Sequence, residues 1–252
     1  PDAALAMSAS RDTTPSTPKQ ILMVVSNPAT STTVGGPVGF WASELTHPFL
    51  AFREAGYEMT IASPEGGRVE FDALSDPRDE SGYSRDDLIS MGFIHTDALM
   101  ARLDDTPSLD DLHEADFDAI VVCGGQGPMF TFRAAERLHA LLAAFYEAEK
   151  PTAALCHGVC ALLDVRLSDG SLLIEGTTIT GFANSEEDIA DEMVGQPVMP
   201  FRVEDEARQR GAHYVTNGPF KPFAIRDGRL ITGQQQYSGT ETAHLVIEAL
   251  GI

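Results

Sequence analysis

Short apolar segments alternate along the chain with longer segments in which apolar residues recur three or four positions apart. The short segments predict strands buried on both faces of a sheet, and the longer period predicts amphipathic helices. Strands are predicted at residues 21–25, 57–63, 117–125, 151–156, 175–182, 213–216, 223–226 and 230–232. Helices are predicted at residues 39–55, 94–103, 109–115, 134–150, 186–193, 203–210 and 239–250, with a further short helix after Gly158. Alternation of this kind predicts an α/β fold with a mainly parallel sheet and helices on both faces.

Two segments fall outside this alternation. Residues 65–115 carry many Asp, Ser and Gly residues around their short helices, so we interpret them as a small helical insertion. Residues 1–18 are rich in Ala, Ser, Thr and Pro without periodicity, and they include Met7 as a candidate start. They are predicted to form a disordered or cloning-derived extension. Residues 19–252 are then predicted to form a single α/β domain.

The charge balance and the cysteines narrow the class of protein. Seventeen Lys and Arg residues stand against 38 Asp and Glu residues, a net charge of −21. A surface this acidic repels phosphate backbones and anionic lipids, so we predict no nucleic-acid partner and no membrane partner. No apolar run approaches the ~20 residues that span a bilayer. Cys123, Cys156 and Cys160 are too few and odd in number for a disulfide framework, and no signal-peptide pattern is present, which favours a reducing, cytoplasmic location.

Cys156 is the strongest candidate for a reactive group. In PTAALCHGVCALL it follows a predicted strand and precedes a predicted helix, and Gly158 permits close backbone approach at the turn. The N–H groups and partial positive charge at a helix start stabilise a thiolate, so we expect Cys156 to have the lowest pKa of the three thiols. A buried, unreactive cysteine is the alternative, and we prefer that interpretation for Cys123 and Cys160. His157 is either a general base beside the thiol or a helix residue that faces the surface.

Two further motifs bring candidate groups to the same region. In VVCGGQGP a buried strand ends in Gly124 and Gly125, which form either a set of N–H donors for an oxyanion or a tight turn that needs positive φ. Only one βα unit separates this loop from Cys156, so the two loops follow neighbouring strands and can converge. In WASELTHPF, Glu44 lies among Trp, Leu, Pro and Phe residues. It is either a desolvated acid with a raised pKa that holds or moves a proton, or part of a solvated helix face.

Together these motifs resemble the ThiJ/PfpI superfamily, and within it the branch of heat-shock-inducible chaperones with glyoxalase III activity. The resemblance runs from about residue 20 to residue 251 and rests, in the family's order, on WASELTHPF, VVCGGQGPMF, AALCHGVCALL, LIEGTTITGFANSEED and GRLITGQQQYS. It implies a flavodoxin-like three-layer α/β sandwich, a Cys–His–acid site at the carboxyl edge of the sheet, and a homodimer. Related amidotransferases use a downstream His–x–Glu pair, and because none follows Cys156, glutamine hydrolysis is disfavoured.

The resemblance also implies roles for individual residues. Cys156 matches the nucleophile, and His157 matches the histidine that follows it. Glu44 matches the buried acid that hydrogen-bonds the thiol. Glu187 matches the acid that orients the histidine, with Glu186 as the alternative one position away. The residues matched to oxyanion and substrate binding are Gly125, its neighbours Gly124 and Gln126, and Gly158.

Gln126 is the one clear departure from the family pattern. Glyoxalase members commonly carry histidine there, in GGHG against the GGQG of this chain. An imidazole can contact the substrate and transfer protons, whereas an amide only hydrogen-bonds. The departure makes another Cys-dependent hydrolase or hydratase at the same site an alternative.

The implied function is a cofactor-independent conversion of small 2-oxoaldehydes, such as methylglyoxal, to 2-hydroxy acids. The Cys156 thiolate would add to the aldehyde, and Glu44 would carry a proton between adjacent carbons. The expected partner is therefore a small aldehyde. No metal is expected, because the other histidines are scattered singly without metal-ligand spacing. The alternative from another class is a stress-protective holdase, with an apolar groove in the insertion for unfolded chains.

Overall fold

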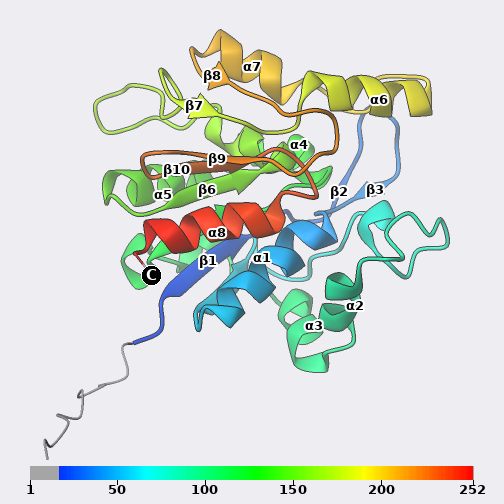
Figure 1. Ribbon diagram of the computed structural model, residues 1–252, viewed down its shortest axis with the longest axis horizontal. Helices are drawn as coiled ribbons and strands as arrows, with labels where there is room; N and C mark the ends of the chain where they lie inside the picture. Colours follow the sequence, from blue (N-terminus) through cyan, green and yellow to red (C-terminus); the bar gives the residue numbers. More distant parts are fainter. Residues whose placement is uncertain (1–16, 252) are drawn as a thin grey trace, which may run out of the picture.

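A six-stranded sheet forms the centre of the molecule, in the order β4-β1-β5-β6-β10-β9 (Figure 1). The computed structural model describes residues 17–251, so most of the predicted extension lies outside the described residues. The strands are β1 Gln20–Val24, β4 Glu58–Ala62, β5 Ala119–Val122, β6 Thr152–Leu155, β9 Ala224–Asp227 and β10 Leu230–Gly233. Neighbouring strands are parallel except β9 and β10, which are antiparallel. The predicted mainly parallel sheet is confirmed.

Helices cover both faces of the sheet, which gives the predicted three layers (Figure 1). Helices α1 (Ala42–Glu54) and α8 (Gly239–Ala249) pack against each other on one face, and α5 (Glu136–Glu147) packs on the other. In β1, Ile21 and Met23 belong to the core on the α1 side, whereas Leu22 and Val24 belong to the core on the α5 side. Successive strand residues point to opposite faces, so a strand between two helical layers is apolar throughout.

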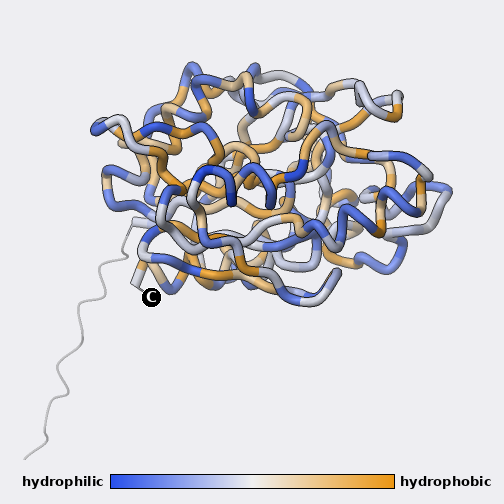
Figure 2. The backbone as a smooth tube through the Cα atoms, turned by 90° about the horizontal axis from the view of Figure 1, so that it is seen from above, coloured by the Kyte–Doolittle hydropathy of each residue, from blue (hydrophilic) through white to orange (hydrophobic). Residues whose placement is uncertain are grey.

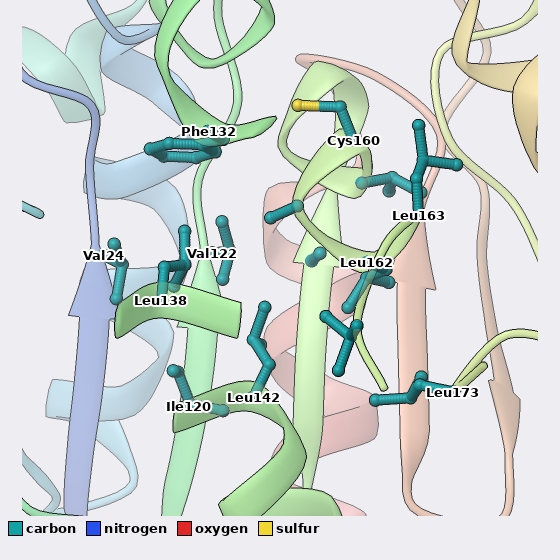
Figure 3. Close-up of a cluster of buried hydrophobic side chains, with 14 of the residues drawn as sticks. Val24, Ile120, Val122, Phe132, Leu138, Leu142, Cys160, Leu162, Leu163 and Leu173 are labelled. Carbon is teal, nitrogen blue, oxygen red and sulfur yellow. The ribbon is translucent and has the colours of Figure 1, made fainter. Parts of the chain in front are cut away.

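The core on the α5 side joins the sheet to the segment that follows β6. Side chains of β5 and α5 meet there with Leu162 (Figure 3). The buried residues of β5 and α5 include Ile120, Val122, Leu138 and Leu142. Burial of each such side chain stabilises the fold by roughly 1.5–3 kcal/mol relative to exposure. Hydrophobic stretches accordingly run through the middle of the molecule, and hydrophilic ones lie mainly on its outer turns (Figure 2).

The insertion differs from its prediction in its helices. The helix predicted at 94–103 is α3 Asp97–Asp104, which starts after the extended backbone at Thr96, and the preceding helix α2 Leu88–Ile94 was not predicted. The helix predicted at 109–115 is wrong. Two 3-10 turns occupy this segment, η2 Leu109–Asp111 and η3 Glu114–Asp116, and the extended backbone of Leu112 and His113 separates them.

The remaining elements lie near their predicted positions, with two differences. The helix predicted after Gly158 is a 3-10 helix, η5 Cys156–Leu162. The strands predicted at 175–182 and 213–216 shorten to β7 Thr178–Ile179 and β8 His213–Tyr214, which pair in a separate parallel sheet. The other elements are β2 Ala29–Thr30, β3 Pro37–Val38, η1 Ala73–Ser75, α4 Gly127–Thr131, η4 Phe132–Ala134, α6 Asn184–Val194 and α7 Val203–Gln209. No helix between residues 17 and 251 is long and apolar enough to cross a bilayer.

Candidate active site

Cys156 lies at a sharp turn directly after β6. Its φ is +56°, a left-handed backbone conformation that residues other than glycine rarely adopt. Gly158 lets the turn approach β5, because a Cβ on Gly158 would lie only 2.7 Å from the carbonyl oxygen of Cys123. The turn that the sequence predicts is therefore present, and its backbone is strained. Strained backbone of this kind is concentrated at functional sites, where the surrounding packing holds it in place.

His157 links the thiol to a buried carboxylate. Its Nε2 lies 2.8 Å from Glu187 Oε1, and its Nδ1 lies 3.8 Å from Cys156 Sγ. The ring stacks on Phe182, with the ring centroids 4.1 Å apart. An ionised carboxylate only accepts hydrogen bonds, so we assign the proton of the neutral imidazole to Nε2. The lone pair on Nδ1 then faces the thiol.

The two neighbouring acids at the start of α6 have different partners. Glu186 accepts hydrogen bonds from the Ala183 N–H, the Phe220 N–H and the Gln234 side-chain amide, each at 2.9 Å. These three bonds occupy both of its oxygens and hold the helix start and the Phe220 loop. The structure thus places Glu187, and not Glu186, against the His157 ring.

Glu44 is fully buried on α1, so the alternative of a solvated helix face is wrong. Its Oε2 accepts a hydrogen bond from the Gly124 N–H at 2.6 Å. Its Oε1 has no hydrogen-bond partner of good geometry among the described residues, and its nearby side-chain partner is the Cys156 thiol. Burial raises the pKa of Glu44 to about 8, and the interactions with Cys156 and Gly124 offset only part of this shift. Glu44 is therefore mainly protonated at neutral pH.

The environment of Cys156 does not lower its thiol pKa, and the expectation that it is the lowest of the three stays a prediction. Burial, followed by the nearby charge of Glu44, raises the pKa of Cys156 well above its usual range, and the His157 N–H offsets only part of this shift. Burial also raises the thiol pKa of Cys123 and Cys160. A reactive Cys156 thiolate therefore needs a proton acceptor, and His157 Nδ1 is in place for this.

The glycine-rich loop offers one free N–H group among the described residues, and not a set of donors. The Gly124 N–H donates to Glu44, and the Gln126 N–H donates to Asp72 Oδ2 at 2.6 Å. Gly125 has a φ of +113°, lies on the cavity wall, and its N–H has no acceptor among the described residues. The N–H groups of Gly124 and Gln126 are occupied, so an oxyanion-donor role for these two backbone groups is wrong, whereas substrate contact by Gln126, which lines the cavity, stays a prediction. Gly158 does not line the cavity, because it packs against β5.

Sequence reasoning missed two residues that contact the predicted site. Asp72 of the insertion is buried and holds the Gln126 N–H, and Phe182 stacks on His157. Asp72 stands in an acidic, turn-rich segment, EFDALSDPRDE, in which no spacing distinguishes it from its exposed neighbours. For Phe182, the position two residues before NSEED was a usable signal, because the family motif GFANSEED includes it.

The site opens into a cavity of about 310 Å³. Its polar part is formed by Cys156, His157, Glu187, Gly125 and Gln126. Apolar side chains from the insertion, from α6 and from the segment after α6 form most of the remaining wall, among them Leu74, Ile189, Met193 and Met199. No group of three side chains that could hold a metal ion occurs in the part of the chain that the structure describes.

The fold and this geometry define a class of protein: a three-layer α/β protein whose cysteine, on a strained turn after a central parallel strand, meets a His–Glu pair and a buried acid. The chain belongs to the DJ-1/PfpI family, whose model matches residues 37–249. It is 30% identical to the probable glutathione-independent glyoxalase hsp3103 of Schizosaccharomyces pombe, over 86% of this chain and 92% of that protein. It is 32% identical to the glutathione-independent glyoxalase HSP31 of Saccharomyces cerevisiae, over 86% of this chain and 91% of that protein.

A solved structure supports the same relationship. The crystal structure of glyoxalase III from Candida albicans is similar with a TM-score of 0.78 and 27% identity, covering 92% of this chain and 97% of that chain. The predicted resemblance to the ThiJ/PfpI superfamily and the predicted three-layer architecture are both confirmed.

We expect the free energy of unfolding to fall as the pH rises from 6 to 8. Folded Glu44 keeps its proton up to its pKa of about 8, whereas the unfolded chain ionises this group near 4.5. Between these values only the folded state holds the proton, so each pH unit costs roughly 1.4 kcal/mol. The pKa of Asp72 is also raised, to about 6, so this group makes the free energy of unfolding fall with rising pH only below about pH 6. Urea unfolding at pH 6, 7 and 8 measures the slope, and an equal slope in Glu44→Gln would contradict a protonated Glu44.

Proposed function

We propose that the chain is a glutathione-independent glyoxalase that converts small 2-oxoaldehydes such as methylglyoxal to 2-hydroxy acids. The observation that supports this most directly is the meeting of three kinds of group at one thiol. His157 offers a proton acceptor 3.8 Å from Cys156 Sγ, Glu44 offers a buried proton carrier, and Gly125 offers a free N–H on the cavity wall. The relatives named glutathione-independent glyoxalases, which match most of this chain, support the same reaction class.

The first step is addition of the thiol to the aldehyde. His157 Nδ1 takes the thiol proton, and Glu187 stabilises the resulting imidazolium through the 2.8 Å contact at Nε2. The sulfur then bonds to the aldehyde carbon, and the Gly125 N–H stabilises the charge that develops on the carbonyl oxygen. Return of the proton from His157 to this oxygen gives a hemithioacetal.

The second step moves a proton between two carbons. The ionised fraction of Glu44 removes the proton from C1. The electron pair of the C–H bond forms the C1–C2 double bond, the C2 carbonyl pair moves to its oxygen, and the proton of the C1 hydroxyl passes to that oxygen. Glu44 then returns its proton to C2 while the C1 oxygen reforms a carbonyl, which gives a thioester of the 2-hydroxy acid with C1 oxidised and C2 reduced. An acid whose pKa of about 8 lies close to the working pH is suited to both removing and returning a proton.

Hydrolysis of the thioester completes the cycle. A water molecule loses a proton to His157 and attacks the thioester carbon, the C–S bond breaks, and the departing sulfur takes the proton back. One methylglyoxal and one water give one lactic acid, so the reaction needs neither an external oxidant nor glutathione.

The purified protein should form D-lactate from methylglyoxal without glutathione, and Cys156→Ala should abolish this turnover, because the variant cannot form the C–S bond. Cys160→Ala is the matched control. Its thiol is also buried, but it donates to the carbonyl oxygen of Pro128 at 3.4 Å and does not line the cavity, so its turnover should stay near wild type. An enzymatic D-lactate assay follows the reaction. Equal turnover by Cys156→Ala and the wild type would exclude the covalent route.

Glu44→Gln should lower kcat by roughly 10² to 10⁴, the usual contribution of general acid–base catalysis. The amide keeps the shape of the protonated acid and accepts from the Gly124 N–H, so the melting temperature should change little. Glu54→Gln, an exposed position on the same helix, serves as the control and should leave kcat unchanged. Steady-state kinetics and thermal unfolding of the three proteins decide this. Full activity of Glu44→Gln would assign the proton transfer to another group.

A holdase is the second candidate function, and apolar side chains exposed at the cavity rim favour it. Met193 and Val194 of α6 are 77% and 54% exposed, and Leu74 of the insertion is 42% exposed. Apolar side chains gathered on one surface are typical of protein-interaction sites. Met193→Glu should therefore weaken suppression of aggregation of an unfolded test protein, while Cys156→Ala should leave it intact. Light scattering at 340 nm reads the aggregation, and equal suppression by Met193→Glu and the wild type would count against a holdase role for this rim.

A homodimer remains a prediction that rests on the family resemblance. Static light scattering at micromolar concentration should give twice the mass of one chain, and the mass of a single chain would contradict it.

The cytoplasmic location and the single domain over residues 19–252 also stay predictions. In the proposed reaction, Gln126 contributes only hydrogen bonds from the cavity wall.

A further inference from the structure

Asp72 joins the insertion to the loop that follows β5. It lies directly before η1 and is 1% exposed. Its Oδ1 accepts from the Gly39 N–H at 2.9 Å, and its Oδ2 accepts from the Gln126 N–H at 2.6 Å. Gly39 also binds the loop that follows β5, because its carbonyl oxygen accepts a hydrogen bond from the Gly127 N–H at 2.7 Å. Asp72 thus holds, with one carboxylate, two chain segments that are far apart in the sequence.

These contacts determine how the Gly125–Gln126 peptide is oriented. The N–H of this peptide points at Asp72, and Gly125 before it has a φ of +113°. The fit is tight, because a Cβ on Gly125 would lie 2.7 Å from Asp72 Oδ2 and 2.4 Å from the Trp41 nitrogen. With the neighbouring N–H groups bound to carboxylates, the Gly125 N–H is left without an acceptor beside the cavity.

We propose that Asp72 is a positioning residue that holds the Gly125 N–H in place to stabilise the oxyanion of the reaction. The inference rests on the proposed glyoxalase function for its catalytic consequence, but the contacts of Asp72 can be tested without it. The N–H groups of Gly39 and Gln126 each require an acceptor oxygen, and the ionised Asp72 carboxylate supplies one to each. In this proposal Asp72 does not contact the substrate. It acts only by holding the glycine loop.

Asp72→Asn is the informative substitution because it keeps the size of the side chain and loses one acceptor. Its amide nitrogen must face either the Gly39 N–H or the Gln126 N–H, and two donors repel each other. Ser90→Ala is the matched control. Ser90 is also buried in the insertion, and its Oγ lies 2.7 Å from Thr46 Oγ1 on α1, so it too ties the insertion to the sheet domain without contacting Asp72 or the glycine loop.

Kinetics with methylglyoxal give the first readout. Asp72→Asn should lower kcat by about 10², the cost of losing one oxyanion donor, while KM changes only a few-fold because the interaction develops in the transition state. Ser90→Ala should lower the melting temperature and leave kcat unchanged. Wild-type kcat in Asp72→Asn, or the same loss of kcat in Ser90→Ala, would overturn the proposal. Absence of turnover in the wild type would overturn the proposed function instead.

Amide NMR of the wild-type protein gives the second readout, which needs neither turnover nor a stable variant. Burial raises the pKa of Asp72 to about 6, and the titratable groups that face it are Glu44 on α1 and His157 on η5. The amide protons of Gly39 and Gln126 should titrate together with a midpoint near pH 6, because both donate to the same carboxylate. Different titration midpoints for the two amide protons would contradict the proposal that Asp72 holds both N–H groups. An unchanged chemical shift of the Gln126 amide proton in a folded Asp72→Asn variant would contradict it as well.

Discussion

The burial of one carboxylic acid, Glu44, determines how the three parts of the site meet. Helix α1 carries it under the end of β5, where the Gly124 N–H donates to it at 2.6 Å. Gly124 has no room for a side chain, because a Cβ would lie 2.4 Å from Glu44 Oε2 and 2.9 Å from Cys156 Cβ. Helix α1, the loop after β5 and the turn at Cys156 therefore approach one another so closely that only glycine fits at position 124. Removal of the carboxyl group from water keeps its proton on at neutral pH, since a buried charge here is costly.

The same burial explains why the site needs both an acid and a histidine. The Cys156 thiol and Glu44 are both driven toward their neutral forms, so neither readily ionises the other. His157 is different, because Glu187 lies 2.8 Å from its Nε2 and stabilises a positive ring. In the proposed chemistry the charge is created at His157 during the reaction, in a mostly apolar cavity where hydrogen bonds and charges act strongly.

The insertion contributes to the site more directly than its composition indicates. It supplies Asp72 to the glycine loop and Leu74 and Tyr83 to the cavity wall. Tyr83 packs edge-on against Trp41, with ring centroids 6.0 Å apart, and so joins the insertion to the start of α1. The insertion, which interrupts the alternation of strands and helices, therefore forms part of the cavity wall.

The sequence by itself determined the α/β alternation, the turn at Cys156 and the choice of Cys156 as the strongest candidate, because periodicity and turn residues are local properties of the chain. The family resemblance, not the local pattern, favoured roles for Glu44 and His157. Only the tertiary structure decided that Glu187 contacts His157, that the thiol pKa is raised, and that Asp72 holds the glycine loop. These outcomes depend on burial and on partners distant in the chain, such as Glu44 and Gly124, 80 positions apart. The period of a helix indicates which residues share a face, but the solvation of a carboxyl group depends on what packs over that face.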